Sequence, residues 1–240
     1  MAAAYDPDLA IVIGDPGVGK TTLLNGMAGY NGVTGIDFAG VTSWEMVEVK
    51  NGPRLANGKC LRVLDTPSWG GPKGLLSEWL TNMFDVLAAE ALHVGAIVIV
   101  TDGTSGKQPF MLDLPYIMTQ IAPALLNVEK NPWDRICIVV SKCNMDFLYV
   151  YCEREEFKSG IVKLMKDNFS SIECPWMDAF DPDRDIIFCG KKDKHPGYDD
   201  LLNRLSELPS DGAMPSTQRE IIQKGINLAL GSSVEGRRRV

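Results

Sequence analysis

The sequence predicts an α/β protein of three layers, in which helices cover both faces of a mostly parallel sheet and one strand runs antiparallel at the edge. Short apolar runs of strand length alternate with longer amphipathic stretches, which is typical of parallel strands joined by helices. Most of the runs are nearly continuous in Val, Ile and Leu, which indicates strands buried on both faces. Residues 50–59, between two of the runs, are rich in Gly, Pro and Asn and too few to hold a helix, so those two strands form a hairpin.

The first half of the chain predicts a strand, a helix, the hairpin and a second helix. The run LAIVI at 9–13 predicts a strand, and the stretch 20–29, which follows a glycine-rich turn, predicts a helix. The runs at 44–49 and 60–65 predict the two strands of the hairpin. The long amphipathic stretch 75–92 predicts the second helix.

The second half repeats the unit of a strand followed by a helix. Apolar runs predict strands at 95–101, 135–141 and 185–189, and amphipathic stretches predict helices at about 109–126, 153–169, 197–207 and near 216–230. The segment 173–185, rich in Pro and Asp, is expected to be a long surface loop. We therefore expect one domain over residues 1–210, and a C-terminal helix with a frayed basic tail over 211–240.

Composition narrows the classes of partner. With 31 acidic and 24 basic residues the net charge is −7, which argues against nucleic acid and against stable binding to an anionic membrane. Three arginines near the C-terminus allow at most a weak membrane contact. The six cysteines form no CxxC pair and lie mostly in apolar runs, as expected for reduced thiols in a cytoplasmic protein.

A phosphate-binding motif lies between the first strand and the first helix. Gly14, Gly19, Lys20 and Thr21 satisfy the pattern G-x-x-x-x-G-K-[ST] in its required setting, after a strand and before a helix. The backbone amides of such a turn point at a β-phosphate, the lysine reaches the β- and γ-phosphates, and the threonine hydroxyl binds Mg²⁺. The same turn supplies further nucleotide-binding residues: Asp15, Gly17, Val18 and Thr22. ATP, GTP and small phosphorylated substrates all remain open at this point.

Other segments belong at the same edge of the sheet, because each follows or precedes a predicted strand. Asp65 ends the strand 60–65, where its carboxylate can hold magnesium. Thr42 lies on the loop before the hairpin and could close over the metal. The segments 138–144 and 188–192 follow two later strands and place polar residues beside the phosphate turn.

Taken in order, these segments resemble the five signature boxes of the Ras-like, translation-factor-related P-loop GTPases, over residues 9 to 207. The spacing of GVTSWEMVEV from Lys20, the DTP of 65–67 and the run HVGAIVIVTDGTSGKQP look most like the immunity-associated GTPases, which are relatives of septins and of chloroplast-import receptor GTPases. The resemblance implies a G domain that binds GTP or GDP with Mg²⁺ held by Thr21, Thr42 and Asp65. It implies catalytic roles for Lys20 and Thr42, with Thr34 as a less favoured rival of Thr42.

The chain departs from the family pattern in two boxes. Ser68 replaces the glycine of D-x-x-G, and Trp69 stands where Ras-type enzymes carry a water-orienting glutamine. In the fourth box, Ser141, Lys142 and Asn144 replace [NT]-K-x-D, so one of the two guanine contacts of the aspartate is lost. Asp146 lies nearby but out of register. Cys189, Gly190 and Lys191 resemble the fifth box, whose middle amide binds the carbonyl oxygen of the base.

These features favour a slow GTP hydrolase or nucleotide-controlled switch. Two alternatives stay open: a pseudo-GTPase interaction module that holds nucleotide without turnover, and a P-loop ATPase or phosphotransferase. The resemblance also implies a nucleotide-dependent homodimer and an effector protein that the sequence does not identify.

Overall fold

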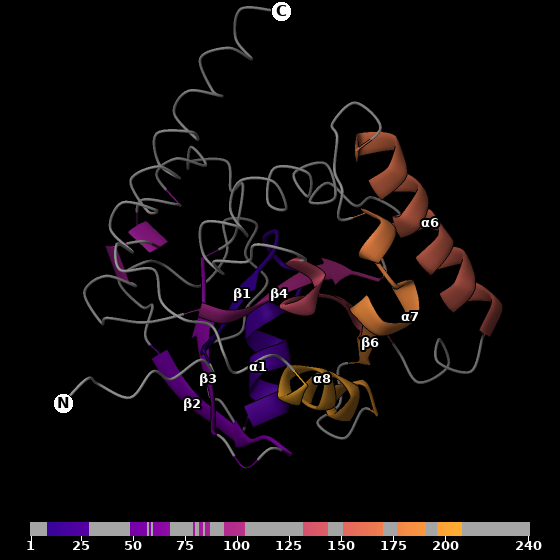
Figure 1. The fold of residues 1–240 in the computed structure, drawn as a ribbon. Coiled ribbons are helices and arrows are strands. Elements are labelled where there is room, and N and C mark those ends of the chain that lie inside the picture. The colour runs from indigo at the N-terminus through magenta and orange to yellow at the C-terminus, as the bar shows by residue number, and fades with distance from the viewer. Residues whose placement is uncertain are drawn as a thin grey trace, which may run out of the picture.

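The computed structural model describes residues 9–28, 49–56, 58, 60–67, 79, 82–83, 85–86, 94–103, 132–143, 151–169, 177–190 and 196–207. Within them the chain forms a six-stranded sheet in the order β2-β3-β1-β4-β5-β6 (Figure 1). The predicted domain boundary at 210 and the predicted helices at 109–126 and 216–230 lie outside the described residues.

The parallel part of the sheet places β1 between β3 and β4. The five parallel strands are β1 (Leu9–Ile13), β3 (Cys60–Asp65), β4 (Val94–Asp102), β5 (Ile136–Cys143) and β6 (Ile186–Gly190). Their bounds agree with the predicted strands to within two residues, so the predicted α/β class with a parallel sheet is confirmed. Ligands of such sheets bind at the carboxyl ends of the strands, which here include the end of β1.

The edge of the sheet is formed by β2 (Val49–Arg54), which pairs antiparallel with β3. The prediction for its bounds was wrong, because residues 50–54, expected in the connecting loop, belong to the strand. A register shift between Asn51 and Arg54 accommodates Gly52 and Pro53. Proline is tolerated there because an edge strand has one side without a partner strand and a bulge interrupts the ladder. Residues 44–48 of the predicted strand lie outside the described residues.

Three long helices match their predictions closely: α1 (Lys20–Ala28), α6 (Tyr151–Phe169) and α8 (Pro196–Ser206). The described residues of the predicted helix 75–92 are helical as well, at positions 79, 82, 83, 85 and 86. None of the described helices combines the length and the apolar character that crossing a membrane requires.

The segment 173–185 is not purely a loop. It contains the 3-10 turn η5 (Met177–Ala179) and the short helix α7 (Pro182–Asp185). The carboxylate of Asp181 caps α7 by accepting the amide hydrogen of Asp183, at 3.0 Å. The Asp-Pro pair that suggested a loop is thus a helix start, with Asp at the cap and Pro in the first turn.

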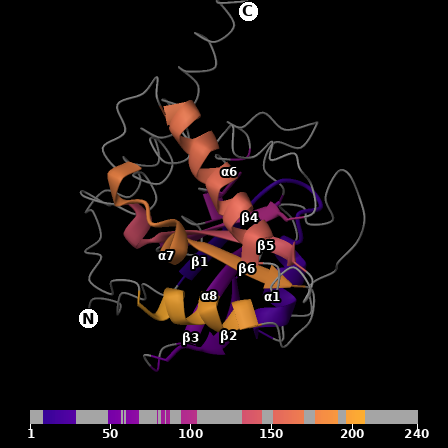
Figure 2. The same cartoon turned by 90° about the vertical axis from the view of Figure 1, so that its right-hand side faces the viewer.

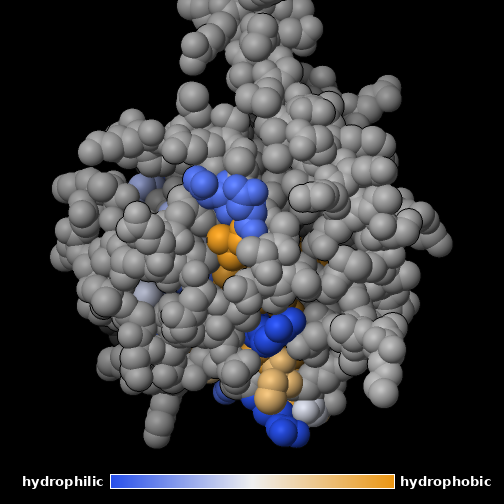
Figure 3. All heavy atoms as spheres, turned by 90° about the vertical axis from the view of Figure 1, so that its left-hand side faces the viewer, coloured by the Kyte–Doolittle hydropathy of each residue, from blue (hydrophilic) through white to orange (hydrophobic). Residues whose placement is uncertain are grey.

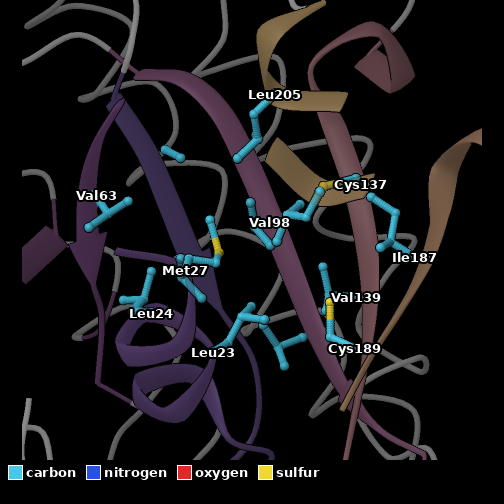
Figure 4. Packing of buried hydrophobic residues seen from close by; sticks show 14 of the residues in the cluster. Leu23, Leu24, Met27, Val63, Val98, Cys137, Val139, Ile187, Cys189 and Leu205 are labelled. Atoms are coloured by element: carbon cyan, nitrogen blue, oxygen red, sulfur yellow. The ribbon is translucent and has the colours of Figure 1, made fainter. Parts of the chain in front are cut away.

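The strands send alternate side chains to opposite faces of the sheet, which builds the three layers. On one face, Val98 and Val139 belong to a buried cluster with Leu24 of α1 and Leu205 of α8 (Figure 4). On the other face, Phe188 of β6 meets Phe157 of α6, with ring centroids 6.0 Å apart. Figure 2 shows α6 crossing one face of the sheet, while α1 and α8 lie on the other.

On the side of the molecule that carries the β2 edge, the described residues in view include both hydrophilic and hydrophobic groups (Figure 3). Arg54 is exposed there, and its guanidinium donates to the carbonyl oxygen of Gly58 at 3.2 Å. This bond closes the turn between β2 and β3.

Candidate functional site

The turn between β1 and α1 is fixed by backbone packing. Gly14 has a φ of 156°, and a Cβ atom there would lie 2.4 Å from the carbonyl oxygen of Val100 in β4. Gly19, with a φ of 96°, ends the turn, and its carbonyl oxygen accepts the amide hydrogen of Leu23 at 2.8 Å. The first amides of a helix have no carbonyl partner within it, so the start of α1 offers donors to an anion at this turn.

Lys20 is the first residue of α1 and is only 7% exposed. Its ammonium donates to the carbonyl oxygens of Gly14, at 3.0 Å, and Asp15, at 3.2 Å, and so folds back over the turn. Burial lowers the pKa of Lys20 from 10.5 to about 8, although the negative charges of Asp65 and Asp15 partly offset this by raising it. A desolvated ammonium in this position gains most from a phosphate group, because an anion restores the charged form.

Thr21 and Asp65 meet at the carboxyl ends of β1 and β3. The Thr21 hydroxyl donates to Asp65 Oδ2 at 2.6 Å, and Asp65 is 4% exposed. Asp65 lies beside Val12 in the register of the two strands. A hydroxyl oxygen and a carboxylate oxygen are ligands that Mg²⁺ prefers, so the donor set fits the predicted metal. Thr42, the third predicted metal ligand, lies outside the described residues.

The start of the loop after β3 is anchored at two points that the sequence did not indicate. The Thr66 hydroxyl donates to the carbonyl oxygen of Val12 at 2.7 Å, and Thr66 is fully buried. The indole of Trp79 donates to the carbonyl oxygen of Pro67 at 2.9 Å. A buried tryptophan needs an acceptor for its indole N–H, so the tryptophan in the predicted helix was the available signal for this second contact. The two bonds hold Thr66 and Pro67 beside the phosphate turn.

Ser141 connects the fourth box to the phosphate turn. Its hydroxyl lies within hydrogen-bonding distance of the carbonyl oxygens of Val18 and of Thr101, the latter at 3.0 Å. One hydroxyl proton serves one of these acceptors at a time. The residue is 5% exposed, and one of its two acceptors, the carbonyl oxygen of Val18, belongs to the phosphate turn. In this structure the predicted nucleotide-binding residue Ser141 thus contacts the phosphate turn.

Lys142 and Asp102 form an ion pair at the same edge. Lys142 has a φ of 59°, an uncommon value for a residue with a side chain. Its ammonium lies 2.5 Å from Asp102 Oδ2, at the end of β4, and its side chain is 42% exposed. Asp102 was not a predicted site residue, although its position at a strand end beside the fourth box is the kind of signal used for Asp65.

Some of the remaining predicted residues lie in the described part of the structure, and the others lie outside it. Gly17 is exposed at the tip of the turn, Val18 is buried, and Thr22 lies half-buried on α1. Cys189 and Gly190 end β6 beside Cys143 of β5, as the fifth box requires. Outside the described residues lie Thr34, Thr42, Ser68, Trp69, Asn144, Asp146 and Lys191.

The fold and the turn define a P-loop nucleotide-binding protein of the α/β class, with Lys20, Thr21 and Asp65 at the carboxyl edge of the sheet. The chain belongs to the family of 50S ribosome-binding GTPases, which it matches over residues 9–143, more than half of its length. It therefore carries a GTP-binding GTPase domain, and the predicted membership of the translation-factor-related P-loop GTPases is confirmed.

Two sequence relatives are bacterial GTPases. GTPase Der from Synechococcus sp. strain JA-2-3B'a(2-13) is 32% identical over 123 residues, which are 51% of this chain and 26% of Der. GTPase Der from Synechococcus sp. strain JA-3-3Ab is 31% identical over the same shares. The match thus spans about a quarter of the length of these relatives.

Solved structures with the same fold include Toc33 from Arabidopsis thaliana. One Toc33 structure superposes with a TM-score of 0.61 at 12% identity and covers 85% of this chain and 84% of Toc33. Another, in complex with GDP and Mg²⁺, has a TM-score of 0.59 at 12% identity with the same coverage. In fold, the chain is therefore similar to a chloroplast translocon component, in line with the resemblance stated from the sequence.

Proposed function

We propose that this protein binds GTP with Mg²⁺ and acts as a slow GTP hydrolase or nucleotide-controlled switch. The observation that carries the proposal is the convergence of the Lys20 ammonium, the Thr21 hydroxyl and the Asp65 carboxylate on one glycine turn. Toc33, which has the same fold, is described in complexes with GDP or GMPPNP and Mg²⁺. Thr21 and Asp65 would hold the metal here, together with Thr42.

The proposed reaction is in-line attack of water on the γ-phosphate. The amides of residues 17–22 and the Lys20 ammonium stabilise the negative charge that spreads over the phosphate oxygens. Mg²⁺ held by Thr21, Asp65 and Thr42 would supply further positive charge to the phosphates. Thr42 and the amide of Ser68 would contact the γ-phosphate, so its loss would release loop 30–43 and the part of loop 66–74 that follows the anchored Thr66 and Pro67.

The proposed rate is low because of Trp69. An indole has one N–H donor and no acceptor, so it neither takes a proton from water nor aligns it as a glutamine does. A Trp69→Gln variant therefore is a direct probe of hydrolysis, with phosphate release expected to rise about tenfold or more.

The proposed base is guanine, held by Lys142, the amide of Gly190 and, in part, Asn144. Asparagine offers one acceptor oxygen and two amide donors, so one guanine donor lacks its usual carboxylate oxygen. This costs about ten- to hundredfold in affinity. The amide donors of Asn144 suit a 2-carbonyl group, so XTP is expected to compete better here than at an aspartate site.

Titration calorimetry with GTP, GDP, ATP and XTP in the presence of Mg²⁺ tests the proposal. We expect GTP and GDP to bind, and Lys20→Ala to abolish binding. Clear preference for ATP contradicts the guanine assignment and favours the ATPase or phosphotransferase alternative, which shares the same turn.

Phosphate release separates a hydrolase from a pseudo-GTPase, a second candidate that the combination of Ser68, Trp69 and Asn144 favours. Slow release above the Lys20→Ala background supports hydrolysis. Release equal to that background, with GTP still bound, supports an interaction module that uses nucleotide for stability.

The proposal includes a homodimer that forms when the γ-phosphate is present. For Toc33 and psToc159, dimerization is described as important for GTPase activity. The measurement is light scattering with GDP and with a non-hydrolysable GTP analogue. We expect a higher mass with the analogue, and equal masses contradict the dimer.

A further inference from the structure

Tyr198 of α8 lies buried between α1 and the end of β6. Its side chain is 5% exposed, and its hydroxyl donates to the carbonyl oxygen of Gly190 at 2.9 Å. Gly190 is the middle residue of the segment 189–191, whose amide is proposed to bind the carbonyl oxygen of guanine. The tyrosine hydroxyl thus contacts the backbone of a proposed base-binding residue.

The ring of Tyr198 also determines how closely α8 approaches α1. A Cβ atom at Gly26 of α1 would lie 2.5 Å from the tyrosine oxygen and 2.6 Å from Cζ, so a larger residue there displaces the ring. At Gly197, a Cβ atom would lie 1.9 Å from the carbonyl oxygen of Phe188 in β6. The start of α8 is therefore pressed against both β6 and the helix that begins with Lys20.

The hydroxyl acts at Gly190, the last residue of β6. Glycine has the widest range of backbone conformations, because it has no side chain. Gly190 by itself therefore restricts the orientation of the peptide group after it very little. A hydrogen bond to the Gly190 carbonyl oxygen restricts that peptide and with it the rotation of Gly190. A phenylalanine fills the same space but lacks the donor, so the effect of the hydrogen bond can be separated from the packing of the ring.

We propose that Tyr198 is a positioning residue for base recognition. Its hydroxyl orients Gly190, and its ring holds Gly190 at a fixed distance from α1, the helix that begins with Lys20. The inference rests on the proposed function, because it assumes that Gly190 faces the base. Tyr198 acts through Gly190 and does not touch the nucleotide.

The test compares GDP, IDP and ADP in competition with a fluorescent guanine nucleotide. Guanine and hypoxanthine both carry the 6-carbonyl oxygen that the Gly190 amide binds, and adenine does not. In Tyr198→Phe we expect the affinity for GDP and IDP to fall about threefold to tenfold, the usual effect of one hydrogen bond. The affinity for ADP stays unchanged, so discrimination between GDP and ADP falls by the same factor.

Two further variants accompany the test. Gly26→Ala keeps the hydroxyl but displaces the ring, and it is expected to give the same selective loss. Ser206→Ala is the matched control, since it removes another hydroxyl of α8 that donates to a carbonyl oxygen, that of Asn203 at 2.6 Å. This variant is expected to bind all three nucleotides as the wild type does.

The outcomes distinguish the inference from the proposed function. If Tyr198→Phe weakens all three diphosphates equally, or none, the positioning role is overturned while guanine binding stands. If Tyr198→Phe does not fold, the result for Gly26→Ala decides in the same way. If the wild-type protein shows no preference for GDP over ADP, both the proposed function and the inference are overturned.

Discussion

At the scale of single residues, the site is a set of polar side chains already joined to one another. Thr21 donates to Asp65, and Lys20 donates to the carbonyl oxygens of the turn. These bonds hold the side chains in place, but a ligand has to compete with them for the same groups. A phosphate has to displace the contacts of Lys20, and a metal has to displace the hydrogen bond between Thr21 and Asp65.

Removing the Thr21 hydroxyl is expected to abolish the effect of Mg²⁺ while sparing the rest of the site. In Thr21→Val the shape is kept but the metal loses one ligand. GDP affinity measured with Mg²⁺ should fall at least tenfold, and GDP affinity measured in EDTA should stay within about twofold of the wild type. A variant that still responds fully to Mg²⁺ contradicts the assignment of Thr21.

The buried cysteines are expected to resist alkylation in the folded protein. Burial raises the pKa of Cys137 and of Cys143 from 9.0 to about 12, and raises that of Cys189 well above 9.0. A higher pKa means less thiolate, the reactive form, at a given pH. At pH 8.5 iodoacetamide should modify the exposed Cys60 and leave these three unmodified until denaturant is added. Peptide mass mapping measures this, and early labelling of Cys137 contradicts it.

At the scale of elements, the phosphate turn depends on its contact with β4. Replacing Gly14 by Ala places a methyl group 2.4 Å from the Val100 carbonyl oxygen, a contact that no side-chain rotation relieves. We expect a loss of about 3 kcal/mol or more in the free energy of unfolding, as in other cases of overpacking against backbone.

Gly17→Ala is the matched control within the same turn. Among the described residues no atom lies within 4 Å of a Cβ atom at Gly17, so within this part of the chain only its φ of 74° opposes the substitution. The expected cost is about 1 to 2 kcal/mol. Denaturant unfolding of both variants measures the difference, and equal losses would show that contact with β4 does not stabilise the turn.

Most elements of the sheet could be predicted, because continuous Val and Ile runs such as those of β4 and β5 have no stable place except between two layers. Residues 50–54 of β2 could not, since the strand's sequence VKNGPR contains few apolar residues and pairs only because β3 lies beside it. The same holds for α7, which contains only four residues and depends on its cap.

The site divides in the same way. Local motifs identified the phosphate turn and Asp65, because glycine spacing and a strand end are visible in the sequence. The contacts of Ser141 with Val18 and of Lys142 with Asp102 join residues far apart in the chain, and that of Tyr198 with Gly190 joins the start of α8 to the end of β6. Only the packing of strands and helices brings them together.

At the scale of the whole molecule, the two ends of the parallel strands differ in what they do. The carboxyl ends carry the residues proposed to bind nucleotide, and the amino ends of β5 and β6 carry a buried charge cluster around Asp185, which is 0% exposed. Its carboxylate accepts from Arg184 Nε at 2.7 Å and from Nη2 at 2.9 Å, and it lies 3.5 Å from Arg204 Nη2. Arg204 also donates to the carbonyl oxygen of Trp133 at 2.6 Å, just before β5.

We therefore expect Asp185→Asn to change stability and not binding. Neutralising Asp185 leaves the buried Arg204 without its opposite charge, and the free energy of unfolding should fall by about 3 kcal/mol. GDP affinity of the folded variant should stay within about twofold of the wild type. Lys20→Ala should show the opposite pattern, with binding lost and unfolding little changed. Denaturant unfolding and calorimetry test the pair, and a large loss of affinity in Asp185→Asn contradicts this division.

The irregular outer strand limits how copies of the chain can join. Pro53 has no amide hydrogen, and the shifted register beside it bends the ladder, so a neighbouring chain cannot continue hydrogen bonding along Val49–Arg54 in the usual way. Growth of this sheet across molecules, the route by which many β-proteins form fibres or swapped pairs, is thereby blocked at β2. Within the described sheet, addition of a strand from a second copy is then left to the opposite edge, β6.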